Sequence, residues 1–143
     1  MYKQEQSTRL NATQHIAELP EIDIEVCTML ANHFEVYLDE MFSMSRKKYC
    51  VYCRHLYARW QRKNTVRSLQ KIGEKVRVLP IDHTTVLHSI ETANALIKTD
   101  SHVRMIWDAI RVIKPFIVMP EYQPDPNWVK TKADNRHLIA QCE

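Results

Sequence analysis

Residues 68–88 read SLQKIGEKVRVLPIDHTTVLH, and they carry the clearest signals of the architecture of the domain. Ser68 is a good helix N-cap, and apolar residues follow it at helical spacing as far as Val76. Pro80 cannot continue a helix interior, so the first helix must end before it. Asp82 can cap a second helix, whose core-facing stripe consists of Val86, Ile90, Ala93 and Ile97. Two helices across a short connection predict a helix-turn-helix.

The sequence on either side of this motif also has helical periodicity. Upstream, the apolar pattern predicts a core helix over residues 22–37, at most a short helical turn over 38–42, and a basic helix that ends near residue 63. Residues 43–48 form the loop before that basic helix. Downstream, residues 103–113 read as an amphipathic helix that closes the domain. We therefore predict an all-α fold, a helical bundle with a helix-turn-helix.

Prolines and loss of periodicity mark the ends of this domain. Residues 1–20 carry little apolar periodicity and end at Pro20, so we expect an N-terminal arm or a loosely docked helix there. The domain itself is expected over residues 21–113. Residues 114–143 are predicted to be an extended, Pro-rich tail, because prolines forbid a regular helix as far as Trp128. The apolar parts of this tail are either a strap over the core or a segment that binds a partner.

Gly73 is the only glycine in the 143 residues. Phosphate-binding loops and dinucleotide-binding turns need several glycines, so neither motif can be written in this sequence. We therefore expect no bound nucleotide, no cofactor and no enzymatic activity. The lack of glycine also disfavours hairpin turns and so supports a helical chain.

Positive charge is concentrated in one part of the chain. The formal net charge is only +3, but a single acidic residue, Glu74, lies among the basic residues between positions 44 and 77. Tyrosines and a tryptophan are interspersed with these basic residues, as on a nucleic-acid-binding surface. A solvated helix face is the alternative, although such a face normally alternates charges of both signs.

Residues 82–88 have the chemistry of a DNA-reading turn. Threonine and histidine are mediocre helix formers, yet here they occupy the first turn, from which helix-turn-helix proteins contact base edges in the major groove. Threonine hydroxyls can bond bases or phosphates, and Leu87 can contact thymine methyl groups. His83 can reach guanine N7 or O6, and Asp82 can accept from cytosine N4. The alternative interpretation is an ordinary capped start of a helix.

The string DHTTVLH at residues 82–88 resembles the DNA-reading signature of the C-terminal domain of the bacterial replication initiator DnaA. The similarity extends over about residues 22–113. It implies the fold of that domain, which is of the Trp-repressor-like type, and binding of double-stranded DNA at an A·T-rich box. It also implies a role in regulating replication or transcription.

The same resemblance implies a set of DNA contacts. In that family an arginine at the place of Arg46 enters the minor groove, while residues at other matching places touch bases or backbone. The implied contacts are Arg46, Arg54, His55, Arg62, Ser68, Asp82, His83, Thr84, Thr85 and Leu87.

Several positions depart from the family pattern. His55 stands where the family commonly has glutamine, and the connection that ends at Leu79-Pro80-Ile81 is longer than the family's glycine-containing turn. Glu91 and Thr92 stand where basic residues are usual, so fewer phosphate contacts are expected. Nothing in the sequence corresponds to the ATPase module of the initiator, so we expect a stand-alone domain that does not drive ATP-dependent origin melting.

Two other functions remain open. The chain could be an interaction protein that keeps the fold and binds a replication or transcription protein through its arm and tail. Cys50, Cys53 and His55 also resemble half of a zinc site, which His137 and Cys142 could complete. A lone C-x-x-C on a basic helix more often supplies two small packing residues, so we expect no metal.

The location and partners follow from the same observations. No signal peptide and no apolar run long enough to cross a membrane occur, so we expect a cytoplasmic, nucleoid-associated protein without membrane contact. The expected partner is duplex DNA, with a homodimer or a protein partner bound through the arm or tail as a further possibility. We expect a virus, plasmid or other mobile element as the source of such a small module.

Overall fold

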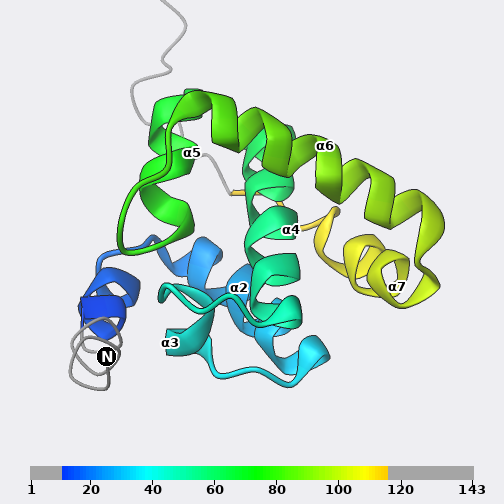
Figure 1. Ribbon diagram of the computed structural model, residues 1–143, viewed down its shortest axis with the longest axis horizontal. Helices are drawn as coiled ribbons and strands as arrows, with labels where there is room; N and C mark the ends of the chain where they lie inside the picture. Colours follow the sequence, from blue (N-terminus) through cyan, green and yellow to red (C-terminus); the bar gives the residue numbers. More distant parts are fainter. Residues whose placement is uncertain (1–10, 116–143) are drawn as a thin grey trace, which may run out of the picture.

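The computed structural model describes residues 11–115, which contain only helices and connections (Figure 1). A helical segment over residues 11–17 comes first. It is followed by α2 (Glu21–Phe34), α3 (Leu38–Met41), α4 (Lys48–Asn64), α5 (Leu69–Val76), α6 (His83–Thr99) and α7 (Ser101–Ile110). The expected all-α fold with a helix-turn-helix is confirmed. Most of the predicted tail, and the first half of the predicted arm, lie outside the described residues.

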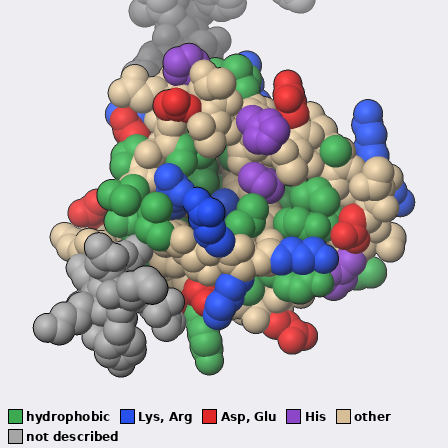
Figure 2. All heavy atoms as spheres, viewed as in Figure 1, with side chains coloured by type: hydrophobic (Ala, Val, Ile, Leu, Met, Phe, Trp, Pro, Cys, Tyr) green, Lys and Arg blue, Asp and Glu red, His purple; other side chains and the backbone are tan. Residues whose placement is uncertain are grey.

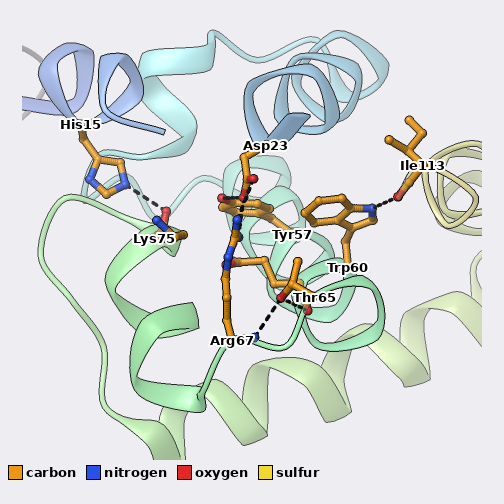
Figure 3. Close-up of polar contacts among 9 residues, drawn as sticks. His15, Asp23, Tyr57, Trp60, Thr65, Arg67, Lys75 and Ile113 are labelled. Atoms are coloured by element: carbon orange, nitrogen blue, oxygen red, sulfur yellow. Dashed lines mark hydrogen bonds and ion pairs between the residues drawn. The ribbon is translucent and has the colours of Figure 1, made fainter. Parts of the chain in front are cut away.

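The basic helix α4 lies at the centre of the domain, and α2, α5 and α6 pack around it (Figure 1). Its apolar side is fully buried, with no exposed surface at Leu56, Tyr57 or Trp60. Trp60 Nε1 donates to the carbonyl of Ile113 at 2.9 Å, which fixes the segment after α7 against α4 (Figure 3). Because one side of α4 is core, only its other side is left for solvent or a ligand.

A buried polar network joins α2, α4 and the connection after α4 (Figure 3). Arg67 donates through Nη1 and Nη2 to the carboxylate of Asp23 at 2.6 and 2.9 Å, and the Tyr57 hydroxyl donates to the same carboxylate at 2.6 Å. Asp23 is fully buried, and a buried charge persists only when it is paired and hydrogen-bonded. Burial also raises the pKa of Tyr57, so its hydroxyl stays a donor. The network therefore fixes the position at which α5 starts.

The connection between α5 and α6 packs directly on Gly73. It runs back along α5 to the start of α6 (Figure 1), and the Ile81 backbone N–H donates to the Gly73 carbonyl at 3.4 Å. A Cβ atom at position 73 would lie 2.2 Å from the Ile81 carbonyl oxygen and 3.2 Å from a methyl carbon of Val86. The only glycine of the sequence is thus needed for close approach inside a helix, and its φ angle is not positive.

The described part of the predicted arm is packed against the core. Ala12 is fully buried and Leu19 is nearly so, and both belong to the main hydrophobic cluster. His15 Nε2 donates to the Lys75 carbonyl at 2.9 Å (Figure 3), and its ring lies 5.3 Å from that of Phe42. Residues 11–19 therefore form part of the packed domain, which starts before the boundary expected at Pro20.

Two helix ends differ from the predicted ones. α2 ends at Phe34 rather than near Tyr37, because Glu35 adopts a left-handed conformation with φ 59° and ψ 45°. The Val36 N–H then bonds the Ala31 carbonyl at 2.9 Å and so closes the helix end. α7 ends at Ile110, although apolar spacing continues to residue 113. Apolar periodicity alone does not reveal where the backbone leaves the helical conformation.

We predict that Gly73→Ala destabilises the domain. Alanine normally favours a helix over glycine, but here its Cβ would collide with backbone rather than with a flexible side chain. The free energy of unfolding in urea should fall by roughly 1–3 kcal/mol, the range for overpacked cores. Gln70→Ala on the exposed side of the same helix is the control and should change it by less than about 0.5 kcal/mol. A more stable Gly73→Ala protein would contradict the observed packing.

Candidate nucleic-acid interface

The first turn of α6 presents polar side chains to solvent. Asp82 is the N-cap and accepts the Thr85 backbone N–H at 2.8 Å, as the sequence predicted. His83, Thr84 and Thr85 are exposed, whereas Val86 is fully buried and anchors the turn to the core. Leu87 is 42% exposed and adds an apolar side chain to this surface. The turn thus combines hydroxyls, an imidazole and one apolar side chain on an outward surface.

Electrostatics at this turn follow from the cap. The backbone N–H of Thr85 holds the pKa of the Asp82 carboxyl below its usual value, so the cap is ionised at neutral pH. Its negative charge lies at the positive end of the α6 dipole and stabilises the helix start. The Asp82 side chain is therefore primarily a cap, with its second oxygen left to accept from a ligand.

His55 connects α4 to the middle of α6. Its Nδ1 is hydrogen-bonded to the hydroxyl of Ser89, which is buried between the helices. Burial lowers the pKa of His55 to about 4, and the nearby charge of Arg54 adds to this effect. His55 is therefore neutral at pH 7, and one of its two ring nitrogens is bonded to α6.

The C-terminal end of α4 and the start of α5 supply further exposed groups. Arg62 and Lys63 are exposed in the last turn of α4. Ser68 is exposed at the N-cap of α5, where its hydroxyl accepts the Lys71 N–H at 3.2 Å. Figure 2 shows Lys and Arg side chains between α5 and α4, and histidines over α6 and α4, on one face of the molecule.

Arg46 lies exposed on the loop between α3 and α4. Two serines order this loop: the Ser45 N–H donates to Ser43 Oγ at 3.1 Å, and the Lys47 N–H donates to Ser45 Oγ at 3.2 Å. A Lys47–Glu40 ion pair at 2.6 Å adds to this order. The backbone of the loop is therefore ordered around Arg46.

Arg54 differs from the other candidate residues because it points inward. It is only 8% exposed, and its guanidinium donates to the carbonyls of Met41 at 2.7 Å and of Ser43 at 3.2 Å. A third bond joins its Nη2 to the carbonyl of Ser45. The structure thus brings nine of the ten candidates to the exposed or half-buried surface and places Arg54 beneath the loop that carries Arg46.

Other basic residues of the positive segment also have structural partners. Arg67 pairs with Asp23, as described above. Arg59 donates to Asn94 Oδ1 at 2.7 Å and lies 5.2 Å from the Trp107 ring centre, and Arg77 donates to the Leu79 carbonyl at 2.8 Å. The positive charge counted over residues 44–77 is therefore larger than the positive charge available on the surface.

Residues that sequence reasoning missed are Ser43, Ser45 and Ser89, each of which positions a candidate group. The Ser-x-Ser spacing directly before Arg46 was a usable signal, because serine hydroxyls commonly bond nearby backbone N–H groups. Ser89 gave no signal, since its partner His55 lies 34 positions away.

The cysteines of the described residues are buried thiols. Cys27, Cys50 and Cys53 are free, and burial raises the pKa of Cys53 to about 12. Over residues 11–115, no group of three or more His, Cys, Asp or Glu side chains is placed to hold a metal ion. His137 and Cys142, which completed the alternative zinc site, lie outside the described residues. In that same described range, every helix is too short or too polar to cross a membrane.

The domain is a helix-turn-helix of the DNA-binding class: α5 and α6 are its two motif helices, and the capped first turn of α6 presents polar side chains to solvent. Residues 24–92 match the family described as the bacterial DnaA protein helix-turn-helix, so this segment is similar to the DnaA-type domain.

Among known proteins, the chain resembles the chromosomal replication initiator proteins DnaA of two bacteria. It is 30% identical over 82 residues to that of Flavobacterium psychrophilum, which covers 57% of the chain and 17% of the relative. It is 31% identical over 88 residues to that of Trichormus variabilis, covering 62% and 18%. The chain thus spans less than a fifth of the length of these relatives. No solved structure matches significantly.

We predict that stability falls as the pH is lowered through the titration of His55. The folded state keeps His55 neutral down to about pH 4, whereas the unfolded chain binds a proton near pH 6.5. The unfolded state therefore binds more protons between these values, and the free energy of unfolding decreases as the pH falls from about 6.5 to 4. Urea unfolding at several pH values should show this slope, and His55→Gln should flatten it. An equally steep slope in His55→Gln would assign the pH dependence to other groups.

Proposed function

We propose that this chain binds duplex DNA sequence-specifically at an A·T-rich, DnaA-box-like site, and thereby regulates replication or transcription without enzymatic activity. The observation that carries the proposal is the outward, capped turn at Asp82 on the same domain as the ordered Arg46 loop. The family match supports DNA binding as the general activity. A DNA-binding role also fits a cytoplasmic protein associated with the nucleoid.

Major-groove reading is assigned to the first turns of α6. His83, Thr84 and Thr85 offer donors and acceptors for base edges, and the exposed Leu87 offers an apolar contact for thymine methyl groups. Because Val86 and Ser89 fix the helix from below, these side chains start from defined positions. Asp82 and the half-buried His55 lie at the border of this surface and are assigned supporting contacts.

Phosphate contacts are assigned to Arg62, Ser68 and those backbone N–H groups at the start of α6 that Asp82 does not already bind. An arginine side chain neutralises a phosphate and gives the salt-dependent part of the affinity, while a helix N-terminus favours an anion. Arg46 is assigned to the minor groove, where A·T-rich DNA concentrates negative potential. A single module of this size buries about 600–1,000 Å² on DNA, so dimerisation or a partner bound by the arm or tail would extend the interface.

The first test concerns base reading by α6. Replacing Thr84 and Thr85 by Ala should weaken binding to a duplex with the box by roughly 2–4 kcal/mol in total and leave binding to a shuffled duplex nearly unchanged. Gel-shift titrations at fixed salt measure both. Thr99→Ala is the matched control, because Thr99 is an exposed threonine at the other end of the same helix, bonded to the Ala95 carbonyl.

Equal losses on both duplexes in the Thr84/Thr85 variant would contradict base reading. If the unmodified protein binds both duplexes with the same weak affinity and loses them near physiological salt, the chain is instead an adaptor that kept the fold and acts through protein contacts.

The second test concerns the minor groove. Arg46→Ala should reduce discrimination in the A·T-rich part of the site by about 1–3 kcal/mol and leave preferences at the major-groove positions unchanged. Selection of bound oligonucleotides from a random pool, done with both proteins, measures this directly. A uniform loss at all positions would show that Arg46 contacts only phosphate.

A further inference from the structure

Arg54 has the surroundings of a structural residue rather than of a DNA contact. Both hydrogens of its Nη1 are used by the carbonyls of Met41 and Ser43, and Nη2 donates to the carbonyl of Ser45. Within residues 11–115, no carboxylate forms an ion pair with it. A buried guanidinium in such a position is stable only because these carbonyls replace its water shell.

The three acceptors of Arg54 belong to one short loop. Met41 ends α3, and Ser43 and Ser45 directly precede Arg46 in the loop to α4. Their carbonyls converge on one planar group, and a planar fork of fixed geometry tolerates little change in the backbone that binds it. Arg54 thus sets the path of the backbone that leads to Arg46.

The same loop is linked to the helix-turn-helix connection. The Val78 N–H donates to the Phe42 carbonyl at 2.9 Å, and Val78 lies in the connection that leads to α6. One hydrogen bond therefore links the Arg46 loop to the connection before α6. The helix α4 links the same two regions, because it follows the loop directly and packs against α6.

We propose that Arg54 is a positioning residue that fixes Arg46 relative to the first turn of α6, so that the domain meets both grooves as one rigid body. This inference rests on the proposed function. In this proposal Arg54 does not contact DNA, and it affects DNA binding only through the position of Arg46. Because the loop is ordered before binding, little conformational entropy is lost when Arg46 enters its groove.

A double-mutant cycle between Arg54→Gln and Arg46→Ala tests the proposal on the full chain. Arg54→Gln should weaken binding to the A·T-rich site by about five- to hundredfold, with the loss of discrimination confined to the positions that Arg46→Ala affects. In the Arg46→Ala background, Arg54→Gln should cost less than about twofold, because its effect passes through a side chain that is already gone.

The salt dependence of binding gives a second readout. In the Arg46→Ala background, Arg54→Gln should leave the slope of log K against log salt unchanged. The matched control, Arg62→Gln, removes an exposed arginine of the same helix and should lower the magnitude of that slope by about 0.9 in either background. Additive losses together with a lower slope for Arg54→Gln would overturn the proposal and establish a direct phosphate contact. An equal loss on every DNA sequence would overturn it in favour of a purely structural role.

Backbone amide exchange tests the loop without DNA. In Arg54→Gln, exchange of the Ser45 and Lys47 amides should accelerate by about tenfold or more, as expected when charged hydrogen bonds are lost, while α6 stays protected. If Arg54→Gln does not fold, Arg54→Lys replaces it, since this change keeps the buried positive charge but removes the planar guanidinium that binds the three carbonyls. Unchanged exchange in the loop would overturn the proposal. If exchange is faster but the unmodified protein has no preference for the box, the proposed function is contradicted and the role of Arg54 in ordering the loop is not.

Discussion

The direction of α6 depends on the close contact between Gly73 and the carbonyl of Ile81. Only a residue without a Cβ lets the connection pack onto α5 at this distance, and Val86 fills the space beside it. This packing places the start of α6 with its polar first turn outward. Contacts farther along α6, from His55 to Ser89 and from Arg59 to Asn94, keep it on α4.

The basic residues divide into two groups with different roles. Arg54 and Arg67 are largely withdrawn from solvent, and each orders backbone or a buried acid within the fold. Arg46 and Arg62 are exposed and available to a ligand. A buried cation costs desolvation energy that its hydrogen bonds must offset, and here those bonds hold a loop backbone and a buried carboxylate. Some of the basic residues that mark the candidate interface in the sequence, namely Arg54 and Arg67, therefore stabilise the fold beneath it.

The sequence could predict the helix-turn-helix because its signals are local. Ser68 and Asp82 act as caps where their side chains suggested it, and the stripe that begins at Val86 faces the core. The inward turn of Arg54 could not be predicted, because its partners are carbonyls of a loop whose shape follows from the whole fold. The sequence left open whether residues 11–19 form an arm or a docked helix for a similar reason: Ala12 and Leu19 are too few to produce a periodic signal, and their burial depends on surfaces distant in sequence.

The Arg67–Asp23 pair also bears on how much chain makes an autonomous folding unit. The family match starts at residue 24, one position after the carboxylate that Arg67 and Tyr57 share. A fragment cut at the matched boundary would leave a guanidinium in the interior without its counter-charge, and would also lose the shield of Ala12 and Leu19. A fragment that keeps α6 in place is therefore expected to include residues that precede the start of the family match.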